Sequence, residues 1–135
     1  MSYAGDITPE RAWEMLRDDP AATLVDVRTE AERRFVGLPD LSTLGREMVC
    51  IEWVHLDGSL NGDFARELTA RVGAGPVIFL CRTGGRSVPA AQTGTELGLT
   101  PSYNVLDGFE GQLDEHGHRG SANGWQAVGL PWKQS

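Results

Sequence analysis

The segment around residue 80 constrains the fold of this chain more than any other. An apolar run, residues 77–80, is followed at once by a cysteine, a loop with two adjacent glycines, and a helical pattern over residues 87–97. A short apolar run without alternation is typical of a strand that is buried on both faces of a parallel sheet. A strand that passes through a tight turn into a helix is the repeating unit of α/β folds. The segment therefore predicts a parallel sheet covered by helices.

The rest of the chain alternates strand and helix patterns in the same way. Further strands are predicted over residues 23–27, 48–56 and 102–106, and further helices from residue 9, over residues 28–35 and from about residue 61. The glycine-rich tail from residue 107 is predicted to form loops with short helical pieces. A length of 135 residues suits one core. We therefore expect a single domain over residues 1–135.

Charge and hydropathy exclude several classes of function. The chain has 12 Lys and Arg against 19 Asp and Glu, a net charge of −7, which disfavours binding to nucleic acid or to anionic membranes. No apolar run approaches the about 20 residues of a membrane-spanning helix, and the N-terminus lacks a signal-peptide pattern. We expect a cytoplasmic protein, in which Cys50 and Cys81 stay reduced.

Cys81 is the predicted nucleophile. Active sites of α/β sheets lie beyond the carboxyl ends of the strands, where Cys81 stands. Loop N–H groups and the positive end of the next helix favour the thiolate, which is the reactive form. Two arginines near the cysteine of an acidic chain indicate an anionic substrate, although a plain surface role stays open for Arg82. The residues predicted to form the substrate-binding loop are Arg82, Thr83, Gly84, Gly85, Arg86 and Ser87.

Several of these residues form a pattern that extends beyond the loop. The spacing Asp26-x-Arg28, Glu32, Cys81-x-x-Gly-x-Arg86-Ser87 and Gly108-Phe109 resembles the single-domain rhodanese-like sulfurtransferases, and the likeness runs from residue 7 to residue 132. It implies an α/β, rhodanese-like, doubly wound domain with a central, mostly parallel five-stranded sheet flanked by helices on both faces. One departure is the histidine-containing segment of the family, which reads Val36-Gly-Leu-Pro-Asp40 here; residues 36–47 therefore carry no prediction.

The resemblance also implies a reaction. Cys81 would take the outer sulfur of thiosulfate or a similar small anionic donor, release sulfite and hold the sulfur as a persulfide. It would then pass this sulfur to a thiophilic acceptor, either cyanide or a thiol, including a protein thiol. The persulfide is itself the carrier, so no metal and no organic cofactor is expected.

Residues around the loop have expected supporting roles. Asp26 and Arg28 are predicted to form a buried pair that orders the site, and Glu32 to hold Arg86 through a bidentate pair. Phe109 is expected to line the mouth of the pocket. Cys50, inside a strand pattern, is interpreted as a small buried hydrophobe. His116 and His118 are interpreted as a loop pair, since the chain lacks the further ligands of a closed zinc site.

Two other functions remain as alternatives. Phosphatases and arsenate reductases use a similar strand–loop–helix with five residues between cysteine and arginine, whereas four separate Cys81 from Arg86. The shorter loop favours a sulfur atom over a tetrahedral oxyanion. The second alternative is a rhodanese-fold binding or regulatory module, a class that often lacks the nucleophile present here.

Overall fold

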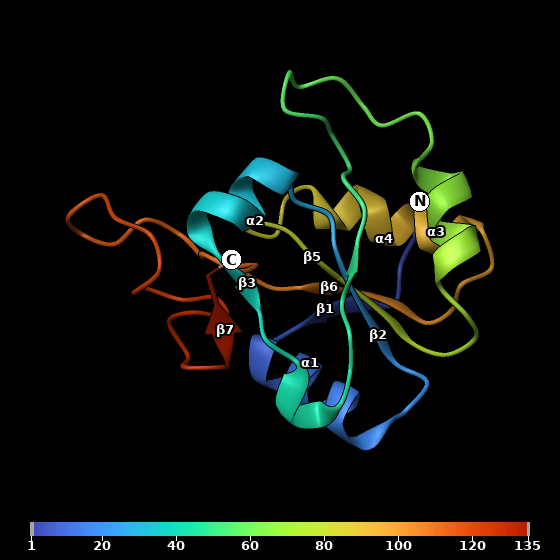
Figure 1. Cartoon of the computed structure of the whole chain (residues 1–135), viewed down its shortest axis with the longest axis horizontal. Coiled ribbons are helices and arrows are strands. Elements are labelled where there is room, and N and C mark those ends of the chain that lie inside the picture. Colours follow the sequence, from blue (N-terminus) through green and yellow to red (C-terminus); the bar gives the residue numbers. More distant parts are fainter. Residues whose placement is uncertain (1, 135) are drawn as a thin grey trace.

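The computed structural model describes residues 2–134. Its centre is a five-stranded sheet with the strand order β1-β6-β5-β2-β4, in which all neighbouring strands are parallel (Figure 1). The strands are β1 (Gly5–Ile7), β2 (Thr23–Asp26), β4 (Val49–Cys50), β5 (Val77–Leu80) and β6 (Ser102–Val105). This sheet confirms the predicted α/β class and places the apolar strand β5 in the middle.

Helices cover both faces of the sheet. They are α1 (Pro9–Asp18), α2 (Glu30–Val36), α3 (Phe64–Arg71) and α4 (Ser87–Glu96). Successive strand residues point to opposite faces, so β5 contributes to two apolar cores. Phe79 packs in the core beneath α3 and α4, and Ile78 in the core beneath α1. All four residues of β5 are buried, as expected for a central parallel strand.

Local sequence signals fix where two of the helices begin. The Thr8 side chain accepts a hydrogen bond from the Arg11 N–H at 3.1 Å, and Pro9 occupies the first helical position of α1. Helix α2 begins with a capping box between Thr29 and Glu32, so it starts at Glu30 and not at residue 28. Figure 1 shows α2 beside the carboxyl end of β5, close to the Cys81 loop.

The prediction of a long strand over residues 48–56 is wrong. Only Val49–Cys50 forms β4, an edge strand that pairs with β2 alone. Beyond β4, the Ile51 and Trp53 N–H groups still donate to the carbonyls of Asp26 and Val27, and an isolated bridge joins Val54 to Leu60. The Trp53 ring packs edge-to-face on Phe64 with ring centroids 4.9 Å apart, so the apolar composition of this segment also serves packing against α3. Strand β1, which the residue patterns did not locate, pairs with β6.

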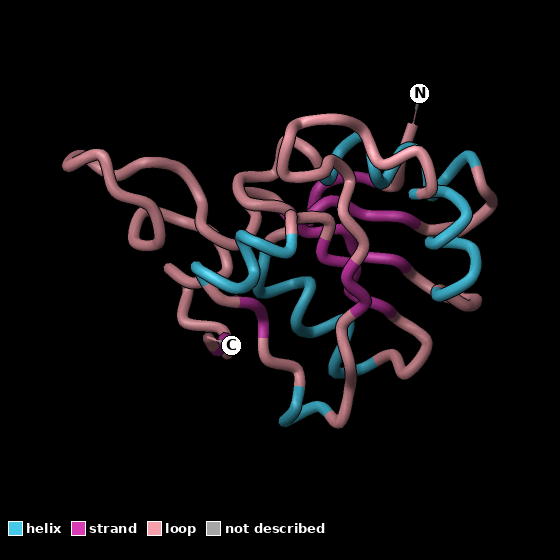
Figure 2. The backbone as a smooth tube through the Cα atoms, turned by 45° about the horizontal axis from the view of Figure 1, so that its top comes forward, coloured by secondary structure: helices cyan, strands magenta, loops and turns pink. Residues whose placement is uncertain are grey.

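Tertiary contacts fix the segment of residues 36–47. Within it, β3 (Leu38–Pro39) pairs antiparallel with β7 (Trp132–Lys133), and a short 3₁₀ helix, η1 (Ser42–Leu44), follows. The Arg46 guanidinium donates to the carbonyls of Leu16, Asp19 and Ala22, which satisfies backbone acceptors at the end of α1. Figure 2 shows the loops of this segment and of the tail running outside the sheet.

No helix within residues 2–134 has the length and apolar character needed to cross a bilayer.

Candidate active site

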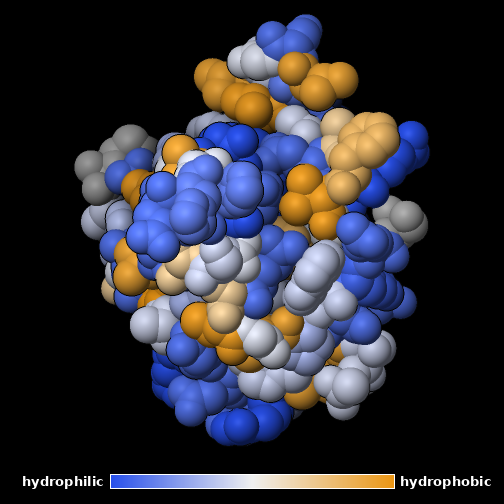
Figure 3. All heavy atoms as spheres, turned by 90° about the vertical axis from the view of Figure 1, so that its left-hand side faces the viewer, coloured by the Kyte–Doolittle hydropathy of each residue, from blue (hydrophilic) through white to orange (hydrophobic). Residues whose placement is uncertain are grey.

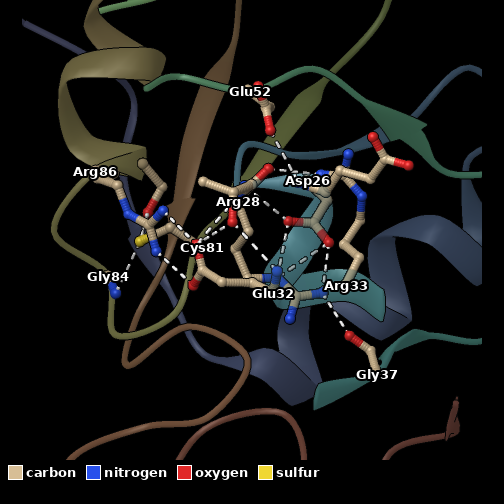
Figure 4. Close-up of polar contacts among 12 residues, drawn as sticks. Asp26, Arg28, Glu32, Arg33, Gly37, Glu52, Cys81, Gly84 and Arg86 are labelled. Carbon is tan, nitrogen blue, oxygen red and sulfur yellow. Dashed lines mark hydrogen bonds and ion pairs between the residues drawn. The ribbon is translucent and has the colours of Figure 1, made fainter. Parts of the chain in front are cut away.

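Cys81 directly follows β5 and is buried, with 1% of its surface exposed. The Gly84 N–H donates a hydrogen bond to its Sγ at 3.1 Å (Figure 4). The Ser87 hydroxyl oxygen lies 3.2 Å from the same sulfur. Gly84 has a φ of 97°, which lets the loop turn back over the sulfur. Among residues 2–134, Gly84 supplies the one backbone N–H in hydrogen-bonding range of Sγ, fewer than the several that the sequence predicts.

The tail after β6 holds the backbone of the Cys81 loop in place. The carbonyl of Cys81 accepts a hydrogen bond from the Phe109 N–H at 2.8 Å, and that of Arg82 accepts one from the Glu110 N–H at 2.9 Å. The approach depends on Gly108, which has a φ of 63° and on which an added Cβ would lie 2.4 Å from the Cys81 carbonyl oxygen. Arg82 and Gly85 are exposed, and Thr83 is half-buried.

Arg86 is held by Glu32 from α2. Its Nη1 and Nη2 donate to the two carboxylate oxygens of Glu32 at 2.7 and 2.9 Å, a bidentate geometry (Figure 4). Burial raises the pKa of Glu32, but hydrogen bonds from Arg86 and Thr29 outweigh this effect and bring the pKa to about 2. Glu32 therefore stays ionised and neutralises much of the positive charge beside Cys81.

Asp26 and Arg28 form a second, fully buried ion pair at the end of β2. Arg28 Nη2 donates to Asp26 Oδ2 at 2.6 Å and to the Gly37 carbonyl at 2.9 Å, while Nε donates to Oδ1 at 3.0 Å. The guanidinium lies 4.3 Å from the centroid of the Phe109 ring. Phe109 is fully buried, so the expectation that it lines the pocket mouth is wrong: it supports Arg28 from inside the core.

Asn104 and Asp6, two polar residues linked to the predicted loop residue Ser87, were missed by the sequence analysis. The Ser87 hydroxyl donates to Asn104 Oδ1 on β6, and Asn104 Nδ2 donates to Asp6 Oδ1 on β1 at 2.9 Å. Ser87 and Asn104 are both buried. An asparagine inside a strand pattern was the available signal, because this residue is disfavoured in strands and costly to bury without partners.

The remaining titratable candidates lie outside this cluster. Cys50, on the edge strand β4, is half-buried, and burial raises the pKa of its thiol. His116 and His118 are exposed in a loop where their N–H groups bond to Asp114. Within the described residues, no group of three potential metal ligands occurs.

Two large apolar side chains near α2 are exposed to solvent. Phe35 on α2 and Leu56 in the loop after β4 are 78% and 79% exposed and border one shallow hollow. Figure 3 shows hydrophobic atoms on the protruding upper loop above a mainly hydrophilic face.

Comparisons with known proteins agree with this geometry. A crystal structure of Rv0390 from M. tuberculosis superposes with a TM-score of 0.95 and 65% identity, covering 99% of this chain and 100% of that one. An uncharacterized protein of Rickettsia rickettsii is 34% identical over 95% of this chain and 96% of its own length. A protein of Actinobacillus pleuropneumoniae named thiosulfate sulfurtransferase GlpE is 29% identical over 93% of this chain and 90% of its own. The sequence profile of the rhodanese-like domain matches residues 8–115, and the chain belongs to the rhodanese-like domain family.

Proposed function

We propose that this protein is a sulfurtransferase that carries a sulfur atom on Cys81, with thiosulfate or a similar small anion as donor. The observation that carries the proposal is the position of Cys81 Sγ: at the carboxyl end of the central strand, 3.1 Å from the Gly84 N–H and 3.2 Å from the Ser87 hydroxyl oxygen. Family membership supports it, as does the 29% identity to a protein named thiosulfate sulfurtransferase.

The proposed reaction has two displacements at sulfur. The Cys81 thiolate attacks the outer sulfur of thiosulfate, the S–S bond of the donor breaks, and its electron pair leaves on sulfite. Cys81 then carries a persulfide anion, which the Gly84 N–H is placed to stabilise. An acceptor thiolate, or cyanide, next attacks the outer sulfur, and the electron pair of the broken S–S bond returns to Cys81. No cofactor enters either step.

Arg86 and Arg82 are proposed to attract the donor. Arg86 is already paired with Glu32, so an incoming anion shares this guanidinium with a carboxylate. Arg82 is exposed and can supply a second positive charge at the entrance. Because Cys81 is 1% exposed, side chains over the sulfur must shift when a donor enters.

Sulfur transfer is preferred to phosphatase or arsenate-reductase chemistry on the geometry of the loop. Only four residues separate Cys81 from Arg86, and the Gly84 N–H points at Sγ itself. A loop that closes on the sulfur leaves less room for a tetrahedral oxyanion. A purely docking module has no need of these contacts to a cysteine.

Intact-mass spectrometry tests the proposal directly. Protein incubated with thiosulfate and freed of small molecules should gain the mass of one sulfur atom and lose it on addition of cyanide, with thiocyanate as product. Cys81→Ser should gain nothing while its circular dichroism spectrum stays unchanged, and Cys50→Ser should load as the native protein does. Absence of the mass gain, together with turnover of an aryl phosphate that depends on Cys81, would reverse the preference.

A further inference from the structure

A chain of polar side chains runs from the protein surface to the sulfur of Cys81. Asp6 on β1 stands directly opposite Asn104 on β6, which stands opposite Phe79 on β5. Cys81 lies two residues beyond Phe79 and therefore on the same face of the sheet. Ser87, at the start of α4, fills the space between Asn104 and Cys81. Among these hydrogen-bonded residues from Asp6 to Cys81, only Asp6 is exposed.

The direction of each hydrogen bond follows from the Asp6 carboxylate, which accepts hydrogen bonds and donates none. An ionised carboxylate only accepts hydrogen bonds, and Asp6 Oδ1 receives them from Asn104 Nδ2 at 2.9 Å and from the Tyr3 hydroxyl at 2.8 Å. The amide of Asn104 must therefore turn its nitrogen to Asp6 and its oxygen to Ser87. The opposite orientation would place an amide oxygen against a carboxylate oxygen. We assign the Asn104 amide from this network.

Ser87 has one hydroxyl proton for two acceptors. When the hydroxyl donates this proton to Asn104 Oδ1, the Ser87 oxygen can only accept a hydrogen bond from Cys81, whose Sγ lies 3.2 Å away. This arrangement suits a protonated thiol. A thiolate or a persulfide anion needs the same proton turned toward sulfur, which would leave the buried Asn104 oxygen without a donor. Asn104 and the sulfur anion thus compete for one hydrogen bond.

We propose that Asp6 and Asn104 are positioning residues that hold the Ser87 hydroxyl away from Cys81, and so favour the thiol over the thiolate. The inference rests on the proposed role of Cys81 as nucleophile and adds control of its reactivity from the surface. Loosening the Asp6–Asn104 contact frees Asn104 to turn its nitrogen to Ser87, and the hydroxyl proton then moves to the sulfur.

Other charged groups lie around Cys81. Arg86 from the loop pairs with Glu32 from α2, and Asp26 pairs with Arg28 at the end of β2. Arg82 in the loop is exposed, and the backbone of Asp107 borders Gly84. The electrostatic effect of the two ion pairs on the sulfur stays the same when Asp6 is replaced. Asp6 differs because it reaches the sulfur through a hydroxyl that can rotate.

The rate of alkylation by iodoacetamide reports this effect, since the thiolate displaces iodide and no sulfur donor is needed. We would measure it from acidic to alkaline pH in Cys50→Ser protein, so that Cys81 is the one thiol. Asp6→Asn should react about tenfold faster at about pH 6.5, the gain expected from one hydrogen bond to an anion. The two rates should converge at alkaline pH, where both sulfurs are fully ionised. Asp6→Ala should act in the same direction.

Two further variants distinguish an effect transmitted through Asn104 and Ser87 from simple loss of charge. Asp107→Asn removes a negative charge from a residue whose backbone borders Gly84 of the same loop, and it should change the rate much less than Asp6→Asn. In a Ser87→Ala background, which lacks the hydroxyl that would transmit the change to the sulfur, Asp6→Asn should have no effect on the rate. An Asp6→Asn gain that matches Asp107→Asn, or that persists without the Ser87 hydroxyl, would overturn the inference. Failure of thiosulfate to load Cys81 would leave these rates untouched and count against the proposed function alone.

Discussion

Arg86 and Glu32, 54 positions apart in the sequence, meet in two parallel hydrogen bonds of 2.7 and 2.9 Å. The same carboxylate accepts the Thr29 N–H at 3.1 Å and closes the capping box of α2. One side chain therefore joins the start of a helix to the end of the Cys81 loop. The charge of Arg86 is available to a substrate only in competition with Glu32.

Arg86→Ala should impair use of the donor more than turnover. Without the guanidinium, Glu32 is left as an unpaired negative charge beside the entry of an anion, and KM for thiosulfate should rise about tenfold or more while kcat falls less. Steady-state thiosulfate:cyanide kinetics measure both constants. Arg82→Ala is the matched control, since it removes a loop arginine without exposing a carboxylate. Unchanged constants for Arg86→Ala would remove this residue from donor binding.

Glu32→Gln should destabilise the fold in a pH-dependent way. The pKa of Glu32 falls from 4.5 to about 2 in the folded protein, because the bonds from Arg86 and Thr29 exceed the opposing effect of burial. A depressed carboxyl pKa stabilises the fold fully above about pH 4.5, and this contribution is lost as the pH falls toward 2. Urea unfolding of both proteins should give a difference that is largest near neutral pH and shrinks across this window. A constant difference would contradict the ion-pair origin.

Asp26→Asn should be among the costliest single substitutions near the site. It leaves the Arg28 guanidinium fully buried without a counter-ion, and breaking a buried pair from one side costs about 3–5 kcal/mol. Urea unfolding at neutral pH measures the loss. Asp18→Asn breaks an exposed pair with Arg17 and should leave the unfolding free energy nearly unchanged. Equal effects from the two substitutions would argue against a structural role for the buried pair.

Gly108→Ala should disturb the Cys81 loop. Both Gly108 and Gly117 have positive φ values, 63° and 78°, but an added Cβ meets the Cys81 and Arg82 backbone at Gly108 and nothing within 4 Å at Gly117. Gly117→Ala therefore reports the conformational strain alone, about 1 kcal/mol, whereas Gly108→Ala adds overlap and should cost about 3 kcal/mol or more. Sulfur loading should fall only in Gly108→Ala. Similar unfolding free energies would mean that the loop can move aside.

Residue patterns predicted the parts of the fold that rest on burial and on local turn chemistry. Strand β5 is apolar throughout because helices cover both of its faces, and the glycines after Cys81 mark the turn into α4. Edge strands were harder, because a strand paired on one side carries a weaker pattern. The patterns do not locate β1, and they predict too long a strand around β4, because the apolar residues after Cys50 also include Trp53, whose ring packs on Phe64 of α3.

The sequence by itself determined the local setting of Cys81, the proposed nucleophile: a cysteine after a buried strand, a glycine turn and a helix start. Tertiary structure alone decided which distant side chains surround that sulfur. Arg86 meets Glu32, Arg28 lies over Phe109, and Asp6 reaches Cys81 through Asn104 and Ser87. Local propensities act over a few residues. These contacts depend instead on strand order and register, which are determined only when the whole sheet forms.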